Sequence, residues 1–219
     1  MQALTAQSYL RSPLTYLLGS GGHVRVLRAL LSYGAPLGVS QLAADSGLTT
    51  RGVRHVLNSL VSQRAVRVLG QPGAQLFVAA MEHPLLPAVG LLFEQERARW
   101  ESLQKELREG LAAQKHIRSA WLYGSVSRGE DEPRSDVDLA LAVDKGTLDV
   151  TQHVRDAVQT LGDKLGVALS AVVLTPADLA RLAPDDPWWT EVVRDAKVLK
   201  GVAPAKEAAR ANKAAAQTA

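Results

Sequence analysis

Four residues within one short stretch have the types and spacing to hold a nucleotide and a metal ion. The stretch, residues 122–141, reads LYGSVSRGEDEPRSDVDLAL. An apolar run ends at Gly124 and Ser125, and Asp136 and Asp138 stand one residue apart at the head of the next apolar run. A glycine lets the backbone approach a phosphate, and a serine hydroxyl donates hydrogen bonds to it together with the N–H groups of a starting helix.

The two aspartates indicate a divalent cation. Residues i and i+2 of a strand project from the same face, so the carboxylates of Asp136 and Asp138 are expected to point the same way. Close carboxylates repel unless a cation lies between them, and Mg²⁺ is commonly held by one or two carboxylates plus substrate phosphates. The alternative is a pair of solvated acids at the start of a strand, which describes most isolated Asp-x-Asp pairs.

The spacing between Gly124-Ser125 and the two aspartates links the phosphate donors to the metal ligands. Ten residues separate Ser125 from Asp136, which leaves room for a helix start, a loop and a returning strand. Such a path places the phosphate donors beside the metal ligands. Arg128 adds a cation near the same turn, where a solvated arginine is the alternative. The pattern therefore predicts nucleotide binding by Gly124, Ser125 and Arg128, and metal binding by Asp136 and Asp138.

Periodic apolar residues predict the elements that must position this stretch. We expect three strands and one long helix, at 119–123, 137–143, 167–174 and 148–165. Pro176 opens a short helical turn, and residues 188–199 are predicted to form a closing amphipathic helix. Residues 202–219 are rich in Ala and Lys and lack an apolar stripe, so we expect a disordered tail there.

The first part of the chain carries a different order of elements. Three helices and two short strands are predicted, at 23–33, 41–46, 50–63, 66–69 and 76–79. Ser40 and Thr49 can cap the second and third helices, and Gly47 turns the chain between them. The five-residue link between the strands contains Gly and Pro and is typical of a hairpin loop. This order is that of a winged helix-turn-helix.

The third of these helices predicts contact with double-stranded DNA. Its apolar stripe leaves an outward face of basic and polar side chains: Arg51, Arg54, His55 and Asn58. Arginine can fork onto guanine or phosphate, asparagine can pair with adenine, and Arg67 on the hairpin can reach a neighbouring phosphate. Residues 1–82 hold seven arginines against two acids, which favours a polyanion. The alternative is a protein–protein or dimerisation module.

Composition excludes several classes of protein. The chain is 47% apolar and 21% charged, which fits a globular protein, and it has no cysteine for a disulfide or a thiolate metal site. No apolar run reaches the roughly 20 residues of a membrane span, and the start lacks a signal-peptide pattern. We therefore expect a cytoplasmic protein with no membrane partner. Acids outnumber bases over residues 115–201, so this part would need a cation to hold phosphates.

Residues 120–143, AWLYGSVSRGEDEPRSDVDLALAV, resemble the signature of the minimal nucleotidyltransferases of the DNA polymerase β superfamily. Residues 187–201, PWWTEVVRDAKVLKG, are similar to the usual end of that family's domain. Winged-helix proteins with such a C-terminal domain form a known group of bacterial and archaeal regulators, and the resemblance covers residues 10–201.

The resemblance implies a two-domain α/β (α+β) fold, in which flanking helices cover a mixed sheet in the C-terminal part. We divide the chain into a winged helix-turn-helix DNA-binding domain, a linker helix, a nucleotidyltransferase-like domain and a tail, at 1–82, 83–114, 115–201 and 202–219. The long linker helix, with the two-fold habit of helix-turn-helix proteins, makes a homodimer an expected assembly.

The resemblance also assigns roles. Gly124 and Ser125 match the positions that hold the phosphates of a nucleoside triphosphate, and Asp136 and Asp138 match the catalytic, metal-binding aspartates. The family's reaction is attack of an acceptor hydroxyl on the α-phosphate, assisted by Mg²⁺. The family usually has a third carboxylate on the next core strand, and here that position falls at Ser170. Serine is a poor Mg²⁺ ligand and no general base at neutral pH.

Three consequences of this serine stay open. Asp144 or Glu130 substitutes from a loop, the acceptor brings its own base, or the domain binds nucleotide without turnover. The leading hypothesis is a DNA-binding transcription regulator whose C-terminal domain binds Mg²⁺–NTP and transfers a nucleoside monophosphate to an unknown acceptor. The alternatives are a non-catalytic, nucleotide-sensing regulator and an antitoxin-like partner of a toxin protein.

Overall fold

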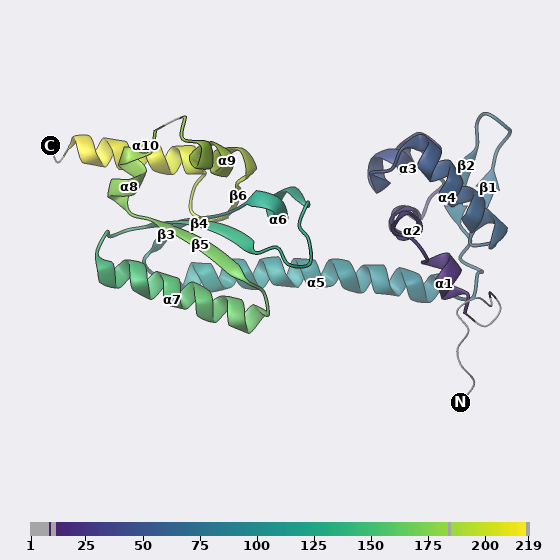
Figure 1. Ribbon diagram of the computed structural model, residues 1–219, viewed down its shortest axis with the longest axis horizontal. Helices are drawn as coiled ribbons and strands as arrows, with labels where there is room; N and C mark the ends of the chain where they lie inside the picture. Colours follow the sequence, from purple (N-terminus) through teal and green to yellow (C-terminus); the bar gives the residue numbers. More distant parts are fainter. Residues whose placement is uncertain (1–8, 10–11, 184, 218–219) are drawn as a thin grey trace. The chain divides into compact units, whose positions relative to one another are not determined.

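The computed structural model describes residues 9, 12–183 and 185–217. The chain forms two compact units that divide between Arg99 and Trp100, inside the helix that the sequence predicts as a linker (Figure 1). The described elements form a mixed α/β structure with two sheets. None of the described helices is long and apolar enough to cross a membrane.

The N-terminal unit consists of helices and a β-hairpin. Its elements are α1 (Leu14–Leu17), α2 (Gly21–Tyr33), α3 (Val39–Ser46), α4 (Thr50–Ser62), β1 (Val66–Leu69), β2 (Leu76–Ala79) and the first part of α5 (Leu86–Ala113). The strands β1 and β2 have the predicted bounds and pair antiparallel. Leu37 adds a bridge to Phe77, with backbone hydrogen bonds in both directions at 2.9 and 2.8 Å. The hairpin thus follows the helices α2, α3 and α4, as the sequence predicts.

Local capping explains where these helices begin. Ser20 accepts the backbone N–H of His23 at the start of α2, and Thr49 accepts that of Gly52 at the start of α4. The expectation that Ser40 caps α3 is wrong, because α3 begins earlier, after Gly38, and has no side-chain cap. One apolar core joins α2, α3, α4, the hairpin and the start of α5.

The C-terminal unit is built on a four-stranded mixed sheet in the order β5-β4-β3-β6. The strands are β3 (Ile117–Tyr123), β4 (Val137–Val143), β5 (Leu169–Leu174) and β6 (Lys197–Lys200). Strand β3 is antiparallel to both β4 and β6, whereas β4 and β5 run parallel. The crossover between the parallel strands is α7 (Leu148–Leu165), which has the predicted bounds.

The two faces of this sheet are covered by different helices (Figure 1). One face packs against α7 and the C-terminal part of α5, through Leu107, Leu122, Leu139 and Val158 among others. The other face packs against α8 (Pro176–Arg181), α9 (Pro187–Asp195) and α10 (Pro204–Ala216). Because side chains alternate along a strand, Tyr123, Asp138 and Ser170 all belong to this second face.

Two predictions about the end of the chain are wrong. Residues 188–199 are not one helix, because α9 ends at Asp195 and the chain then forms β6 against β3. Residues 202–217 are not disordered, because α10 packs on the sheet with Glu207 and Ala211 buried. A small alanine and a paired carboxylate replace the apolar stripe that the prediction required, and residues 218–219 lie outside the described part.

Candidate functional site

Gly124 and Asp138 meet at the end of the two central strands. Strand β3 ends at Tyr123, which pairs with Asp138 of β4. The next residue, Gly124, has φ +73° and begins the short helix α6 (Gly124–Arg128). A Cβ at Gly124 would lie 2.5 Å from Oδ2 of Asp138. The position therefore requires glycine twice over, for its left-handed backbone and for the carboxylate that lies against it.

The two aspartates form a site with excess negative charge. Burial raises the pKa of the Asp138 carboxyl above its ordinary value, and the nearby charges of Asp136 and then Glu191 raise it further. Neither Asp136 nor Asp138 has a side-chain hydrogen bond or an ion pair with the described residues. A cation between these carboxylates would relieve the repulsion, so the pair fits a hard, oxygen-binding metal ion.

Ser170 stands beside Asp138 in the sheet. Strands β4 and β5 pair in parallel, and the register aligns Asp138 with Ser170. Both side chains lie on the face that α9 covers, and Ser170 is exposed. The strand position that would carry a third carboxylate thus holds a hydroxyl, as the sequence predicts. No group of three or more His, Asp or Glu side chains in the described part of the chain is arranged to hold a metal ion.

The two loop acids considered as replacements for the missing carboxylate have other partners. The Asp144 carboxylate lies 3.1 Å from Nδ1 of His116. Asp144 follows Asp138 by six residues along β4 and just beyond it, about 20 Å at ~3.3 Å per residue. Glu130 pairs with Nε of Arg128 at 2.7 Å. Of the alternatives left open, substitution by Asp144 does not fit this distance, and Glu130 is paired with an arginine.

Arg128 is bound by acids rather than left free beside the turn. Besides Glu130, its guanidinium contacts Glu191 at 3.2 Å and donates a hydrogen bond to Asp195, both of α9. These carboxylates raise the pKa of Arg128. Hydrogen bonds from Arg194 and Arg128 hold the pKa of Asp195 at about 2. In this arrangement Arg128 joins α6 to α9, and a phosphate would have to compete with three carboxylates for it.

The hydroxyls of α6 differ in their bonding. Ser127 donates to the backbone carbonyl of Asp195 at 2.6 Å and anchors α6 to α9. The hydroxyl of Ser125 has no partner among the described residues and is half-buried beside Gly124. Ser125 is therefore the hydroxyl of this turn that is available to a ligand.

Aromatic residues of α9 support the same corner. Trp188 donates its indole N–H to the hydroxyl of Tyr123 at 3.0 Å, and the two rings meet edge to face. Burial raises the pKa of Tyr123. Sequence reasoning missed Glu191, Asp195 and Trp188 as part of this corner, because they approach it from 50 or more residues away along the chain.

The outward face of α4 is a second candidate site, in the N-terminal unit. The predicted residues Arg51, Arg54, His55 and Asn58 are all exposed, whereas Val53, Val56, Leu57 and Leu60 are buried. Neither Arg51 nor Arg54 has an ion-pair partner in the described part of the chain. On β1, the side chain of Arg67 is 3.5 Å from the Glu82 carboxylate, and both are exposed.

Comparison with known families bears on the C-terminal unit. Residues 105–196 match the family model described as polymerase beta, nucleotidyltransferase. This segment contains α6, both aspartates and the register that aligns Ser170 with Asp138. It covers less than half of the chain, and it leaves the N-terminal unit unassigned. No curated protein sequence matches the chain.

Solved structures with a related arrangement cover about half of the chain. One is described as a toxin-antitoxin with AMP-PNP, at 18% identity, a TM-score of 0.38 and coverage of 52% of this chain and 88% of that one. Another is described as the toxin-antitoxin MntA-HepT, at 15% identity, a TM-score of 0.35 and coverage of 54% and 88%. At such scores these similarities carry no weight for the function.

Proposed function

We propose that the nucleotidyltransferase domain at residues 105–196 binds a nucleoside triphosphate together with Mg²⁺ at the corner formed by Gly124, Ser125, Asp136 and Asp138. The observation that carries the proposal is the contact between Gly124 and Asp138. It brings a glycine turn with a free serine hydroxyl against an unpaired carboxylate. The phosphates would lie on the turn, and Asp136 and Asp138 would hold the metal. The bound metal would supply charge neutralisation for the phosphates.

Nucleotide transfer at this site is proposed to be slow. The aligned position on β5 is Ser170, whose hydroxyl neither holds Mg²⁺ well nor accepts a proton at neutral pH. The acids that could compensate are occupied, because Asp144 pairs with His116 and Glu130 with Arg128. Nucleotide binding needs only the turn and the two aspartates. We therefore propose that the site binds the nucleotide although it transfers it slowly.

Isothermal titration calorimetry with ATP, GTP, CTP and UTP in Mg²⁺ tests binding whether or not the site turns over. We expect at least one nucleotide to bind, and Asp138→Asn to weaken binding about 10-fold or more by removing one metal ligand. Asp144→Asn at the far end of the same strand is the matched control and should leave affinity unchanged. Equal affinity of wild type and Asp138→Asn would refute the assignment.

The limit on transfer has a separate test. Ser170→Asp restores a carboxylate beside Asp138, and we expect pyrophosphate release from the bound nucleotide to rise about 10-fold or more, the effect of ~1.4 kcal/mol of transition-state stabilisation. Ser170→Asn, which has the size of aspartate without its charge, is the comparison variant. A Ser170→Asp protein that binds nucleotide and is no faster than wild type would show that another group limits transfer.

We further propose that the N-terminal unit binds double-stranded DNA through α4 and the hairpin, as a winged helix-turn-helix does. What supports this is the exposed set of Arg51, Arg54, His55 and Asn58 on the face of α4 opposite its buried stripe. Arginines without protein partners are free to contact phosphates or guanine. If the N-terminal unit binds DNA and the C-terminal unit binds a nucleotide, the protein would be a transcription regulator that responds to the nucleotide.

Duplex binding is tested by fluorescence anisotropy at several salt concentrations. Arg54→Ala should weaken binding, and if Arg54 contacts a phosphate the salt dependence should become shallower by about one ion. Arg108→Ala, an exposed arginine of α5 outside this face, should behave as wild type. Loss of affinity to the same extent in both variants would indicate a nonspecific charge effect and would count against α4.

A further inference from the structure

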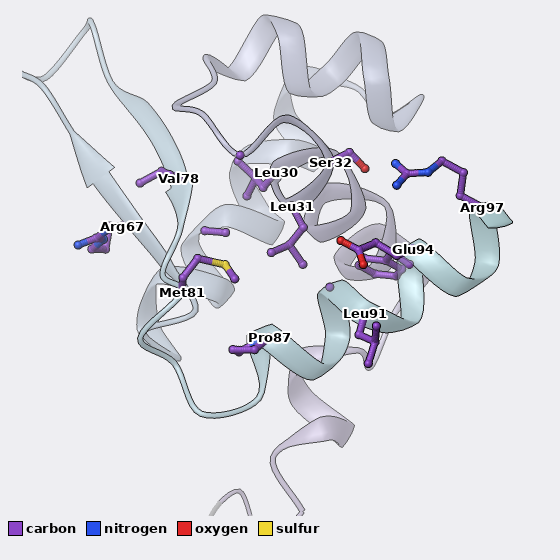
Figure 2. Close-up of a pocket in the computed structure, with 14 residues that line it drawn as sticks. Leu30, Leu31, Ser32, Arg67, Val78, Met81, Pro87, Leu91, Glu94 and Arg97 are labelled. Carbon is purple, nitrogen blue, oxygen red and sulfur yellow. The ribbon is translucent and has the colours of Figure 1, made fainter.

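The N-terminal unit contains an open, largely apolar groove away from the exposed face of α4. It has a volume of about 670 Å³. Three walls form it: the end of α2, the hairpin, and the first part of α5 (Figure 2). This volume is within the ~300–1,000 Å³ typical of sites for small organic ligands. The groove has no part in the nucleotide site or in the proposed DNA contacts of α4.

The middle of the groove is apolar, and part of it is exposed to solvent. Leu30 and Leu31 of α2 and Met81 after the hairpin point into it, and Leu91 of α5 closes one side (Figure 2). Met81 is 52% exposed and Leu91 is 55% exposed. A ligand that covered them would be stabilised by the removal of this apolar surface from water. Met81 has a flexible thioether that adapts to different shapes.

Charged side chains lie at the ends of the groove and also along it, where Glu94 stands between Leu91 and Arg97 on α5. Figure 2 shows Arg97 and Ser32 at one end and Arg67 on the hairpin at the other. Arg97 has no ion pair or hydrogen bond through its side chain with the described residues, whereas Arg67 lies 3.5 Å from Glu82. Glu94 lies one helical turn before Arg97, and Arg67 is already paired with Glu82, so Arg97 is the lining cation that has no ion-pair partner among the described residues.

We propose that this groove is a binding site for a small amphipathic organic anion, with an apolar aromatic or alkyl body over Leu31, Met81 and Leu91 and an anionic group at Arg97. An unpaired guanidinium beside an apolar surface recognises a carboxylate or sulfonate by charge-assisted hydrogen bonds. The apolar middle supplies most of the affinity, and Arg97 fixes the orientation. The site does not depend on the nucleotide proposal, and it shares the hairpin, with Arg67, with the DNA proposal.

A pair of dyes tests the two parts of this recognition on the full-length protein. The probe is 1-anilinonaphthalene-8-sulfonate, and its uncharged analogue N-phenyl-1-naphthylamine has the same rings without the sulfonate. We expect one dye molecule to bind per chain, with the sulfonate dye bound more tightly. Arg97→Gln should weaken the sulfonate dye about 10-fold, the loss of one charge-assisted hydrogen bond, and leave the analogue unchanged. Arg99→Gln, on the same helix but outside the groove, is the control.

The apolar surface is tested by a matched pair of leucines. Leu91→Glu places a charge inside the groove and should weaken both dyes about 10-fold or more, because the dye must then cover a desolvated carboxylate. Leu92, the next residue, is similarly exposed at 57% and does not line the groove, so Leu92→Glu should bind both dyes as wild type does. Neither substitution alters a buried side chain, so both variants should fold.

Three results would overturn the proposal. The first is equal dye affinity in Leu91→Glu and Leu92→Glu, which would mean that the dye binds elsewhere. The second is that Arg97→Gln and Arg99→Gln bind the sulfonate dye equally. The third is a wild-type dimer in light scattering that excludes the dye and that Leu91→Glu converts to monomers, since a second copy of the chain would then cover the groove.

Discussion

At the scale of single residues, the site depends on a backbone conformation that only glycine adopts without strain. Gly124 turns the chain from β3 into α6 with its φ at +73°, and the Asp138 carboxylate fills the space where a side chain would be. The same carboxyl group has a raised pKa because it is buried and faces other acids. Asp138 of the proposed metal site and Gly124 of the proposed phosphate turn therefore constrain each other.

A comparison of Gly124 with Gly129 separates the strain of a left-handed backbone from the contact with the Asp138 carboxylate. Gly129 ends α6 with φ +74°, and a Cβ there would meet nothing within 4 Å, whereas a Cβ at Gly124 would lie 2.5 Å from Asp138. Gly129→Ala should cost only the left-handed strain, about 1–2 kcal/mol. Gly124→Ala should cost more and should also abolish Mg²⁺–nucleotide binding, because Asp138 must move. Urea unfolding measures the loss of stability in each variant, and calorimetry measures nucleotide binding. Equal losses of stability would mean that the Asp138 carboxylate can move away from the new methyl group without cost.

His23 supports a prediction about pH in the N-terminal unit. Its ring is within hydrogen-bond distance of Ser20 Oγ at 2.6 Å and Ser59 Oγ at 3.0 Å, and so links the start of α2 to α4. Burial and then the nearby His55 lower its pKa below 6.5. The folded state therefore holds this proton less tightly than the unfolded state.

The sign of the pH dependence follows from that difference. The free energy of unfolding should be highest above pH 6.5, should fall as the pH drops from there toward the lowered pKa of folded His23, and should level off below it. His23→Gln should flatten this slope, and His55→Gln should reduce it in part. Circular dichroism melts between about pH 5 and 8 provide the measurement. An unchanged slope in His23→Gln would contradict the assignment.

At the scale of elements, the last helix and strand complete the sheet and hold its second face. Strand β6 pairs with β3, and Trp121 donates its indole N–H to the carbonyl of Val202 at 2.7 Å. Glu207 of α10 is buried and bonds with Arg118 and with the Ser119 hydroxyl of β3, the latter at 3.0 Å. A buried carboxylate thus fastens α10 to the central strand.

Removing the cation of this pair should be costly. Arg118→Gln leaves the buried Glu207 carboxylate without its nearest cation, while Arg210 stays 3.6 Å away. Because the Arg118 side chain is 41% exposed, we expect a loss of about 2 kcal/mol, less than for a fully buried pair. Lys105→Gln removes the exposed pair with Glu109 at 3.9 Å and should cost less than about 0.5 kcal/mol. Chemical unfolding measures both, and similar small losses would show that Glu207 does not depend on Arg118.

At the scale of the whole molecule, the chain contains two compact units with separate apolar cores. The proposed DNA-binding face belongs to the first unit and the proposed nucleotide site to the second. Each unit contains the residues that build its own site. All four tryptophans lie from Trp100 onward, so their fluorescence reports on the second unit.

We expect the units to respond separately to core substitutions. Leu139→Ala, in the core of the second unit, should lower the urea midpoint of tryptophan fluorescence, since such changes cost about 2–5 kcal/mol. Leu27→Ala, in the first core, should leave the fluorescence midpoint in place and shift only the part of the circular dichroism transition that belongs to the first unit. A fluorescence midpoint that moves equally in both variants would show one cooperative unit.

Elements with local signals could be predicted from the amino-acid sequence. The alternation and apolar runs of β1, β2 and β4, the stripe of α7 and the cap at Thr49 depend on neighbours within a few residues, and their predicted positions are confirmed. The exposed face of α4 followed from the same periodicity. The spacing of Gly124, Ser125, Asp136 and Asp138 indicates a nucleotide and metal site, and the family that residues 120–143 resemble is the one whose model matches residues 105–196.

Contacts between residues far apart in the sequence were revealed by the folded structure. Sequence analysis does not predict β6, because its residues continue the amphipathic pattern of α9 and become a strand only by pairing with the distant β3. It does not predict α10, because this helix packs through small alanines and through an ion pair between the buried Glu207 and the half-exposed Arg118. The ties of Arg128 to Glu191 and Asp195 depend on contacts across more than 60 residues. Such contacts leave no periodic trace in the sequence, because charge pairing and close packing depend on where the folded backbone brings each side chain.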